Sequence, residues 1–357
     1  MLQRVVLRIK SVVTLLLSVV VLMAAPVGAT DDAIQSDAWL ARMGGAFATQ
    51  NYSGVFVYTH GSSMDTMRII HRVEAGIERE RIVRLDGPKQ EIIRNDGKVT
   101  CVHDSDWSGN INHKIPLGPF AKAFVRDMSE LGDSYQLVEK GKSRVAGRDA
   151  LVLLIQPRDD YRYGYSIWLD EETGLLLKSI LVHRGKVLER FQFTQLSISD
   201  QIDEAELEVG IMGGTMVHYP LLSHDEDLVD HKALDWKLDW LPAGFEMRMQ
   251  GSHREKKDGN GADTITFTDG MAAFSVFIEK ITDQKYEEVT AQKGATVAVT
   301  RIMNYPTGDH LVTVVGEVPM KTAKRIALSV VASTPTFSLT DKAPVTLETS
   351  PADMSVQ

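Results

Sequence analysis

The 357-residue chain carries 39 Lys and Arg side chains against 48 Asp and Glu side chains, a net charge of −9. An acidic protein gains nothing by neutralising phosphates, so we expect no nucleic-acid partner. The length exceeds the roughly 250–300 residues over which one hydrophobic core keeps growing, which predicts two domains. Cys101 is the only cysteine, so an intramolecular disulfide is excluded.

The start of the chain is typical of a removable export signal. Basic residues and no acidic ones precede an apolar run from Val12 to Ala25, which is shorter than the ~20 residues of a membrane-spanning helix. Small residues end this region, so residues 1–29 are predicted to be a signal peptide that is cleaved near Ala29. No cysteine follows that a lipid would modify. We therefore expect the remaining chain to reside in the bacterial periplasm.

Residues 30–200 are predicted to form a large β-rich domain. Its first element is a helix over 36–49, because apolar side chains recur there every three or four residues, and a second helical segment is expected at 119–131. Ten short segments rich in Val, Ile and Tyr and separated by turn residues are expected to be strands, at 52–60, 67–74, 77–85, 89–94, 98–103, 135–140, 145–156, 163–170, 175–184 and 187–198.

These ten strands are expected to pair as an antiparallel meander. The connections between them are too short for the crossover helices that parallel strands need. Many sequential strands must also curl or close to protect their edges. We therefore predict an α+β fold in which the first domain is a half-open, curved antiparallel barrel with helices against its concave face.

A change of composition precedes a second, smaller domain. Residues 201–213 combine acidic side chains with glycine and are predicted to be an exposed linker. Residues 214–332 are expected to form a small α+β domain, with a helix that begins at Pro319. The tail at 333–357 lacks periodicity, which predicts disorder. Strands of the second domain are expected at 236–239, 245–253, 263–268, 272–280, 295–303 and 310–316.

A search for catalytic and metal-binding motifs finds no G-x-S-x-G elbow, no H-E-x-x-H and no paired C-x-x-C. The best metal-like cluster is His218, His224 and His231 with Asp225 and Asp227. Its spacing fits no rigid ligand geometry, and a solvated acidic linker explains these residues equally well. The sequence therefore predicts neither an enzyme nor a bound metal or cofactor.

Aromatic side chains are the remaining candidates for function. Phe56 and Tyr58 share one face of a strand, because side chains two residues apart project together. Ordinary core packing explains any one such residue. The alternative is that the open side of a half-open barrel is not filled by its own side chains, which leaves an apolar groove for a lipid chain or a partner's helix. The groove candidates are Phe56, Tyr58, Trp107, Phe120, Phe124, Trp168, Phe191 and Phe193, and the candidates for an interdomain surface are Leu241, Pro242 and Phe245.

Several longer strings resemble the MucB/RseB family. NYSGVFVY at 51–58, MRIIH at 67–71 and ERERIVRLDGP at 78–88 resemble its opening strands. LPAGF at 241–245 looks like the entry to the family's second domain, and HLVTVVGEV at 310–318 resembles its penultimate strand. Strings of this length, in this order, are far more specific than a short motif.

The resemblance implies a function that spacing alone does not. Family members are periplasmic negative regulators of the envelope-stress sigma factor. They bind the periplasmic segment of a membrane-spanning anti-sigma factor and shield it from proteolysis until lipid or lipopolysaccharide releases it. The large domain of the family is similar to lipoprotein carriers, so a periplasmic carrier of lipid or lipoprotein is the alternative function. Formation of a homo-oligomer is left open.

Overall fold

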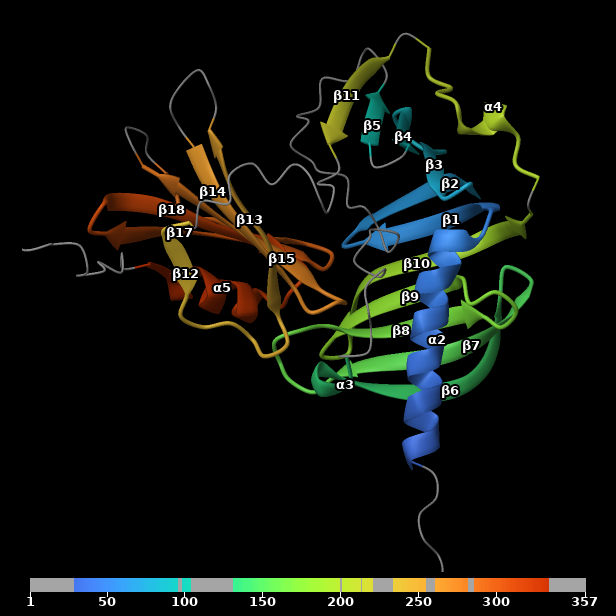
Figure 1. Cartoon of the computed structure of the whole chain (residues 1–357), viewed down its shortest axis with the longest axis horizontal. Helices are drawn as coiled ribbons and strands as arrows, with labels where there is room; N and C mark the ends of the chain where they lie inside the picture. Colours follow the sequence, from blue (N-terminus) through green and yellow to red (C-terminus); the bar gives the residue numbers. More distant parts are fainter. Residues whose placement is uncertain are drawn as a thin grey trace, which may run out of the picture.

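The described part of the chain folds into two β-sheet domains that lie side by side (Figure 1). The computed structural model describes residues 29–95, 98–103, 131–199, 201–212, 214–220, 234–254, 261–281 and 286–333. Most of the predicted signal peptide, the helical segment before Leu131 and the tail after Ser333 lie outside these ranges. Within them, no helix is long and apolar enough to cross a membrane.

The larger sheet has 11 antiparallel strands in the order β11-β5-β4-β3-β2-β1-β10-β9-β8-β7-β6. Because β11 and β6 are both edges, the sheet curves without closing, and the predicted half-open barrel is confirmed. The strands are β1 (Tyr52–His60), β2 (Ser63–Glu74), β3 (Ile77–Arg84), β4 (Gln90–Asn95), β5 (Lys98–His103), β6 (Tyr135–Val145), β7 (Arg148–Pro157), β8 (Gly164–Asp170), β9 (Leu176–His183), β10 (Lys186–Ile198) and β11 (Thr215–Pro220).

Two-residue turns produce this meander. Ala146 and Gly147 join β6 to β7 with φ of 48° and 82°, and Arg184 and Gly185 join β9 to β10 with φ of 48° and 78°. Two successive residues with positive φ match the twist of the flanking strands, which keeps consecutive strands paired.

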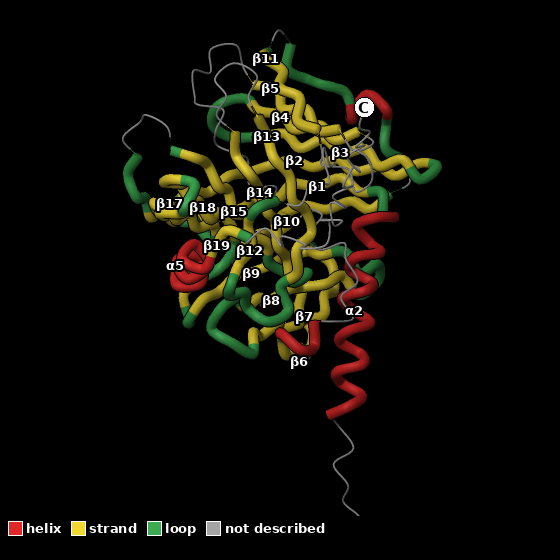
Figure 2. Tube along the Cα trace, turned by 60° about the vertical axis from the view of Figure 1, so that its left-hand side comes forward, coloured by secondary structure: helices red, strands yellow, loops and turns green. Residues whose placement is uncertain are grey.

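Helix α2 (Ala29–Thr49) packs on the concave face of the large sheet (Figures 1 and 2). Its Leu40 and Met43 have no exposed surface and belong to the same apolar cluster as Ile69 of β2 and Leu153 of β7. A sheet that curves around a helix buries both apolar faces at once, so the predicted placement of this helix is confirmed. The short helix α3 (Leu131–Ser134) leads into β6.

The second domain is a six-stranded antiparallel sheet in the order β13-β14-β15-β18-β17-β16, with helix α5 (Met320–Ser329) on one face. Ala323, Ile326 and Ala327 of α5 are fully buried against the sheet, as their helical spacing predicts. The remaining elements are β12 (Trp236–Leu238), β13 (Glu246–Arg254), β14 (Gly261–Thr268), β15 (Ala273–Lys280), β16 (Thr290–Lys293), β17 (Thr296–Tyr305), β18 (Gly308–Gly316) and β19 (Val330–Ala332), which pairs with β12.

The connection between the two sheets departs from the predicted exposed linker. Ile202 and Leu207 are buried against Ile70 of β2, and Leu207 ends the short helix α4 (Glu204–Leu207). Residues 215–220, expected in the second domain, instead form β11 and pair with β5 from Thr215↔His103 to Pro220↔Lys98. The prediction was wrong because acidic composition marks solvent contact but does not show which strand edge a segment covers.

Candidate functional site

Three of the predicted groove residues form one aromatic cluster on the concave face. The Phe56 and Phe191 ring centroids are 5.0 Å apart, and those of Phe191 and Phe193 are 5.2 Å apart. These rings and the neighbouring Tyr58 are no more than 6% exposed. They therefore lie close together, but inside the core and not along an open groove.

Two side chains of the second domain belong to the apolar core that contains these rings. Met271, in the β14–β15 turn, and Ala295, which precedes β17, are 2% and 0% exposed. Both belong to the same apolar cluster as Phe56 and Phe191. The second domain therefore contributes to the core of the first along a contact that we call the seam.

Trp168 does not belong to the aromatic cluster, which corrects the prediction. Its neighbours Ile167 and Leu169 face the main core, so Trp168 projects to the opposite face of β8, where the Lys178 ammonium lies 4.4 Å from its ring. The other three groove candidates, Trp107, Phe120 and Phe124, lie outside the described residues.

A buried ion pair crosses the seam. Arg162, in the connection between β7 and β8, donates from Nη1 to Asp269 Oδ2 over 3.0 Å, and the two side chains are 0% and 1% exposed. Tyr135 Oη donates to the same Asp269 oxygen over 2.9 Å. Burial and the nearby Asp269 carboxylate raise the pKa of Tyr135, so its hydroxyl remains a donor.

The predicted interdomain residues adjoin this ion pair. The Arg162 guanidinium lies 5.0 Å from the Phe245 ring and also donates to the carbonyl of Ala243. Pro242 is buried, and Leu241 packs against the core of the second domain. Sequence reasoning missed Arg162; the only local signal was an arginine between two tyrosines in a connection expected to be exposed.

A second polar group at the seam is built on Glu189 of β10. Its Oε1 accepts from the backbone N–H of Ala295 over 2.8 Å, and its Oε2 accepts from Tyr58 Oη over 2.5 Å. Burial and the Glu189 carboxylate raise the pKa of Tyr58. Tyr163 Oη lies 3.1 Å from the Ala295 carbonyl and 2.8 Å from the Val318 carbonyl. The seam thus combines the buried Met271 and Ala295 side chains with hydrogen bonds to the second domain's backbone.

The described residues between β10 and β11 lie on the convex face as an ionic strap, which we define as residues 199, 201–212 and 214. Its Glu204 pairs with Arg72 at 3.0 Å and with Arg79, and its Gly210 N–H donates to Glu91 over 2.9 Å. The strap therefore ties β2, β3 and β4 together from outside.

A hollow of about 540 Å³ lies beside the end of the strap. Arg81 and Arg84 line it, but Arg81 is paired with Glu91 at 3.0 Å and Arg84 with Asp65 at 2.7 Å. Two of the three cationic side chains that line the hollow are therefore paired with carboxylates, and the third is the exposed Lys89. Across the described ranges, no group of three or more His, Cys, Asp or Glu side chains is placed to hold a metal ion.

Comparison with known proteins assigns the chain. The profile of the MucB/RseB N-terminal domain matches residues 35–211, and that of the MucB/RseB C-terminal domain matches residues 230–331. The chain belongs to the MucB/RseB family. It is 40% identical over 319 residues to the sigma factor AlgU regulatory protein MucB of Pseudomonas aeruginosa, covering 89% of this chain and 96% of that protein. It is 31% identical over 298 residues to the sigma-E factor regulatory protein RseB of Haemophilus influenzae, covering 82% and 89%.

Solved structures of the family agree with this assignment. The crystal structure of MucB in complex with MucA(peri) is 36% identical, has a TM-score of 0.68 and covers 84% of this chain and 99% of that chain. A structure of the Pseudomonas aeruginosa MucA/MucB complex has the same identity and coverage, with a TM-score of 0.69. Both domains of the present chain are therefore those of the family.

Proposed function

We propose that this protein is a non-enzymatic periplasmic regulator that binds the periplasmic segment of a membrane anti-sigma factor and protects that segment from regulated proteolysis. The observation that carries the proposal is the 40% identity, over 89% of the chain, to a sigma factor regulatory protein. The related MucB, 36% identical, forms a complex with MucA(peri), which supports a partner of that kind.

Lipid or lipopolysaccharide is proposed as the releasing signal, and the seam suggests how an acyl chain would act. The apolar core that contains Phe56 and Phe191 also contains Met271 and Ala295 of the second domain. An acyl chain that enters this shared core would displace packed side chains at the seam, which loosens the seam. Trp107, Phe120 and Phe124 remain candidates for the same groove. A lipid occupant and a partner that needs the docked domains would therefore exclude one another.

A lipid or lipoprotein carrier is the alternative function. A carrier needs a cavity that holds its cargo in the resting protein, typically of ~300–1,000 Å³ with an apolar lining. The four described aromatic candidates on the concave face are instead buried by protein side chains. This packing favours the regulator over the carrier.

A protection assay tests the proposal. Purified protein is mixed with the periplasmic fragment of the cognate anti-sigma factor and the protease that makes the first cut, and the cleavage rate is measured. We expect cleavage to slow as the protein approaches stoichiometry and to recover when lipopolysaccharide is added. Equal rates with and without the protein would refute the proposal.

Two variants make the assay specific for the seam. Met271→Asp places a charge on a buried side chain of the seam, so we expect weaker protection of the anti-sigma fragment from cleavage. Leu328→Asp places the same charge on an α5 side chain that is 60% exposed and should leave protection unchanged. Equal loss in both variants would mean that the seam has no special role.

A further inference from the structure

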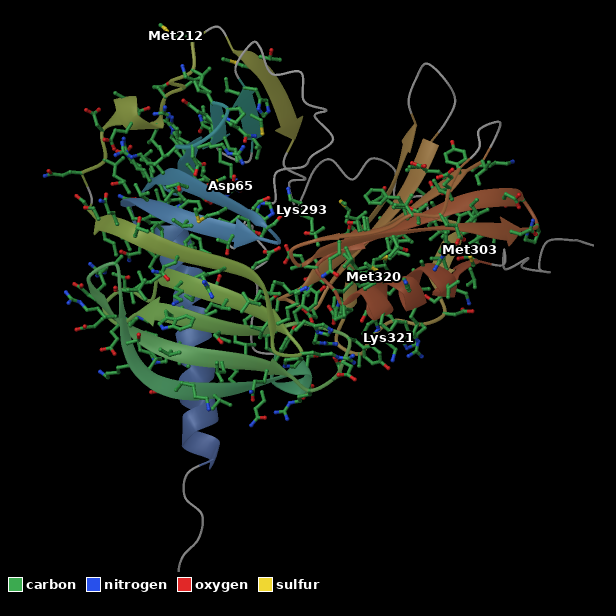
Figure 3. All side chains as sticks on the ribbon, turned by 180° about the vertical axis from the view of Figure 1, so that it is seen from behind. Asp65, Met212, Lys293, Met303, Met320 and Lys321 are labelled. Atoms are coloured by element: carbon green, nitrogen blue, oxygen red, sulfur yellow. The ribbon has the colours of Figure 1, made fainter. Side chains whose placement is uncertain are left out.

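The hairpin between β16 and β17 meets the first domain with its tip. The four residues of β16 are all exposed, whereas the next two, Gly294 and Ala295, are buried. Lys293 pairs with Thr296, so Gly294 and Ala295 are the two central residues of the turn, and Gly294 has a φ of 59°. Figure 3 shows Lys293 on the side of the second domain that faces the first. Turn tips normally lie in solvent, so burial that begins at this tip indicates a specific contact.

Side chains of the first domain bind both backbone groups of Ala295. Its N–H donates to Glu189 Oε1 over 2.8 Å, and its carbonyl lies 3.1 Å from Tyr163 Oη. Burial, followed by the negative charges of Glu317 and Glu189, raises the pKa of Tyr163, so its hydroxyl keeps the proton that it donates. The Ala295 side chain has no exposed surface and lies in the same apolar core as Phe56. Main-chain hydrogen bonds, combined with an apolar site for one side chain, are how proteins recognise a peptide segment.

The position before this alanine is restricted by size. A Cβ on Gly294 would lie 2.5 Å from Glu189 Oε1 and 3.1 Å from His60 Cβ. Both neighbours are held in place, because His60 Nε2 lies 3.1 Å from Asp65 and Glu189 Oε2 accepts from Tyr58 Oη over 2.5 Å. A larger residue would have to break these contacts, and the positive φ disfavours one as well. Glycine is therefore required at this position.

The tip contact is separate from the ion pair of the seam. The ion pair joins Arg162 to Asp269 in the β14–β15 turn, whereas the tip belongs to the β16–β17 hairpin. Strand β16 is an edge strand that pairs only with β17. An exposed edge hairpin is among the first parts of a fold to open locally. The tip can therefore leave the first domain while the ion pair still joins the two domains.

We propose that Glu189, Tyr163 and His60 form a socket in the first domain that recognises a Gly–Ala turn of a peptide chain, and that residues 294–295 of the second domain are its resident ligand. When the tip leaves, the socket presents a carboxylate acceptor, a hydroxyl donor and an apolar site for a methyl group. A peptide turn with the same two residues can then take the place of the tip. The socket is a property of this chain and does not rest on the proposed partner.

The first test releases the tip without changing the type of turn. Ala295→Asp introduces a residue that turns accept, but it buries a charge opposite Glu189, so the tip should leave the socket. Ala291→Asp adds the same charge to an exposed position of the same hairpin and is the control. Amide hydrogen exchange is measured in the full chain. We expect exchange over residues 294–297 to become at least about tenfold faster in Ala295→Asp and to stay at the wild-type rate in Ala291→Asp. Equal exchange in the two variants would overturn the proposal.

The second test asks whether the empty socket recognises the turn itself. The probe is a hairpin peptide with the sequence of residues 290–299, closed by a disulfide between cysteines added at its ends. It is titrated by calorimetry into the full-length Ala295→Asp protein up to about 1 mM, the effective concentration that a short tether supplies. We expect the peptide to bind this variant and not the wild type, whose socket is filled by its own tip.

Two changes show which groups the socket reads. The same peptide with Gly294→Ala should not bind, because its Cβ would meet Glu189 and His60. Adding Tyr163→Phe to the Ala295→Asp protein should weaken binding at least about fivefold, because the peptide's alanine carbonyl loses its donor. Gly294→Ala in the full chain empties the socket by a steric route and replaces Ala295→Asp if that variant fails to fold. Binding that is equal for the glycine and alanine peptides, or absent for both, would contradict the proposal.

Discussion

The ion pair between Arg162 and Asp269 gives the most demanding test of how the two domains are held together. Asp269→Asn keeps the size of the side chain but removes its charge. Its Oδ1 still accepts from the N–H groups of Met271 and Ala272 at 2.9 Å and 2.7 Å, so the turn itself should survive. The loss therefore falls on the buried Arg162 and on Tyr135, because both donate to the oxygen that the substitution replaces.

The magnitude follows from burial. Both side chains of the pair are at most 1% exposed, and removing one partner of such a pair costs about 3–5 kcal/mol because the other charge stays buried without compensation. Arg162 keeps a second carboxylate, Asp159, at 3.3 Å, which is 28% exposed and so compensates weakly. We therefore expect Asp269→Asn to lower the free energy of unfolding by about 3 kcal/mol, at the lower end of that range.

Urea unfolding followed by tryptophan fluorescence measures this loss. The second domain carries Trp236 and Trp240, so its release from the seam should appear as an earlier transition. The control is Asp239→Asn, which removes an exposed pair with Lys237 at 3.6 Å and should cost less than about 0.5 kcal/mol.

A double-mutant cycle completes the test. Arg162→Met combined with Asp269→Asn removes both charges, so the double variant should be more stable than the sum of the single losses predicts, by at least about 2 kcal/mol. If Asp269→Asn costs under about 1 kcal/mol, or the cycle shows no coupling, the ion pair does not stabilise the seam as its burial suggests.

Two further predictions concern the strap and the acid stability of the large sheet. In Gly210→Ala the new Cβ would lie 2.3 Å from Arg81 Nη2, so we expect the free energy of unfolding, measured in urea, to fall by about 1–2 kcal/mol. The control is Gly45→Ala in helix α2. Its Cβ would have nothing within 4 Å, so the free energy of unfolding should rise by up to about 1 kcal/mol. Burial alone would raise the pKa of Asp170, but hydrogen bonds from Arg148 and Thr173 outweigh it and hold the pKa below its usual value. Asp170 therefore stabilises the fold above about pH 4 and loses this effect as pH falls, so Asp170→Asn should flatten the acid limb of a stability curve against pH.

Much of the fold was predictable because strand signals are local. The segments 52–60 and 98–103 were expected as strands and are β1 and β5 with the same bounds. Alternating side chains and two-residue turns determine such hairpins within a few residues of sequence. The order of the meander follows, since consecutive antiparallel strands tend to be neighbours.

The contacts of the site were less predictable because they join distant parts of the chain. Arg162 and Asp269 are 107 positions apart, and neither carries a local signal of its partner. The sequence pattern also could not show that Phe191 shares one apolar core with Met271 and Ala295 of the second domain, since burial depends on what packs against a strand face. Trp168 was grouped with the other aromatic residues by side-chain type alone. Adjacent residues of a strand point to opposite faces, so its neighbours Ile167 and Leu169 face the core and Trp168 does not.

The pairing of β11 with β5 determines where this protein can be divided. A fragment that ends at residue 213 would remove β11 and leave β5 (Lys98–His103) paired with β4 on one side only. An uncovered strand edge invites pairing between molecules, so such a fragment should aggregate. A fragment that ends after Pro220 keeps this edge paired, although it lies beyond the boundary that composition suggests. The first domain therefore extends to Pro220, beyond the end at residue 200 that amino-acid composition predicts.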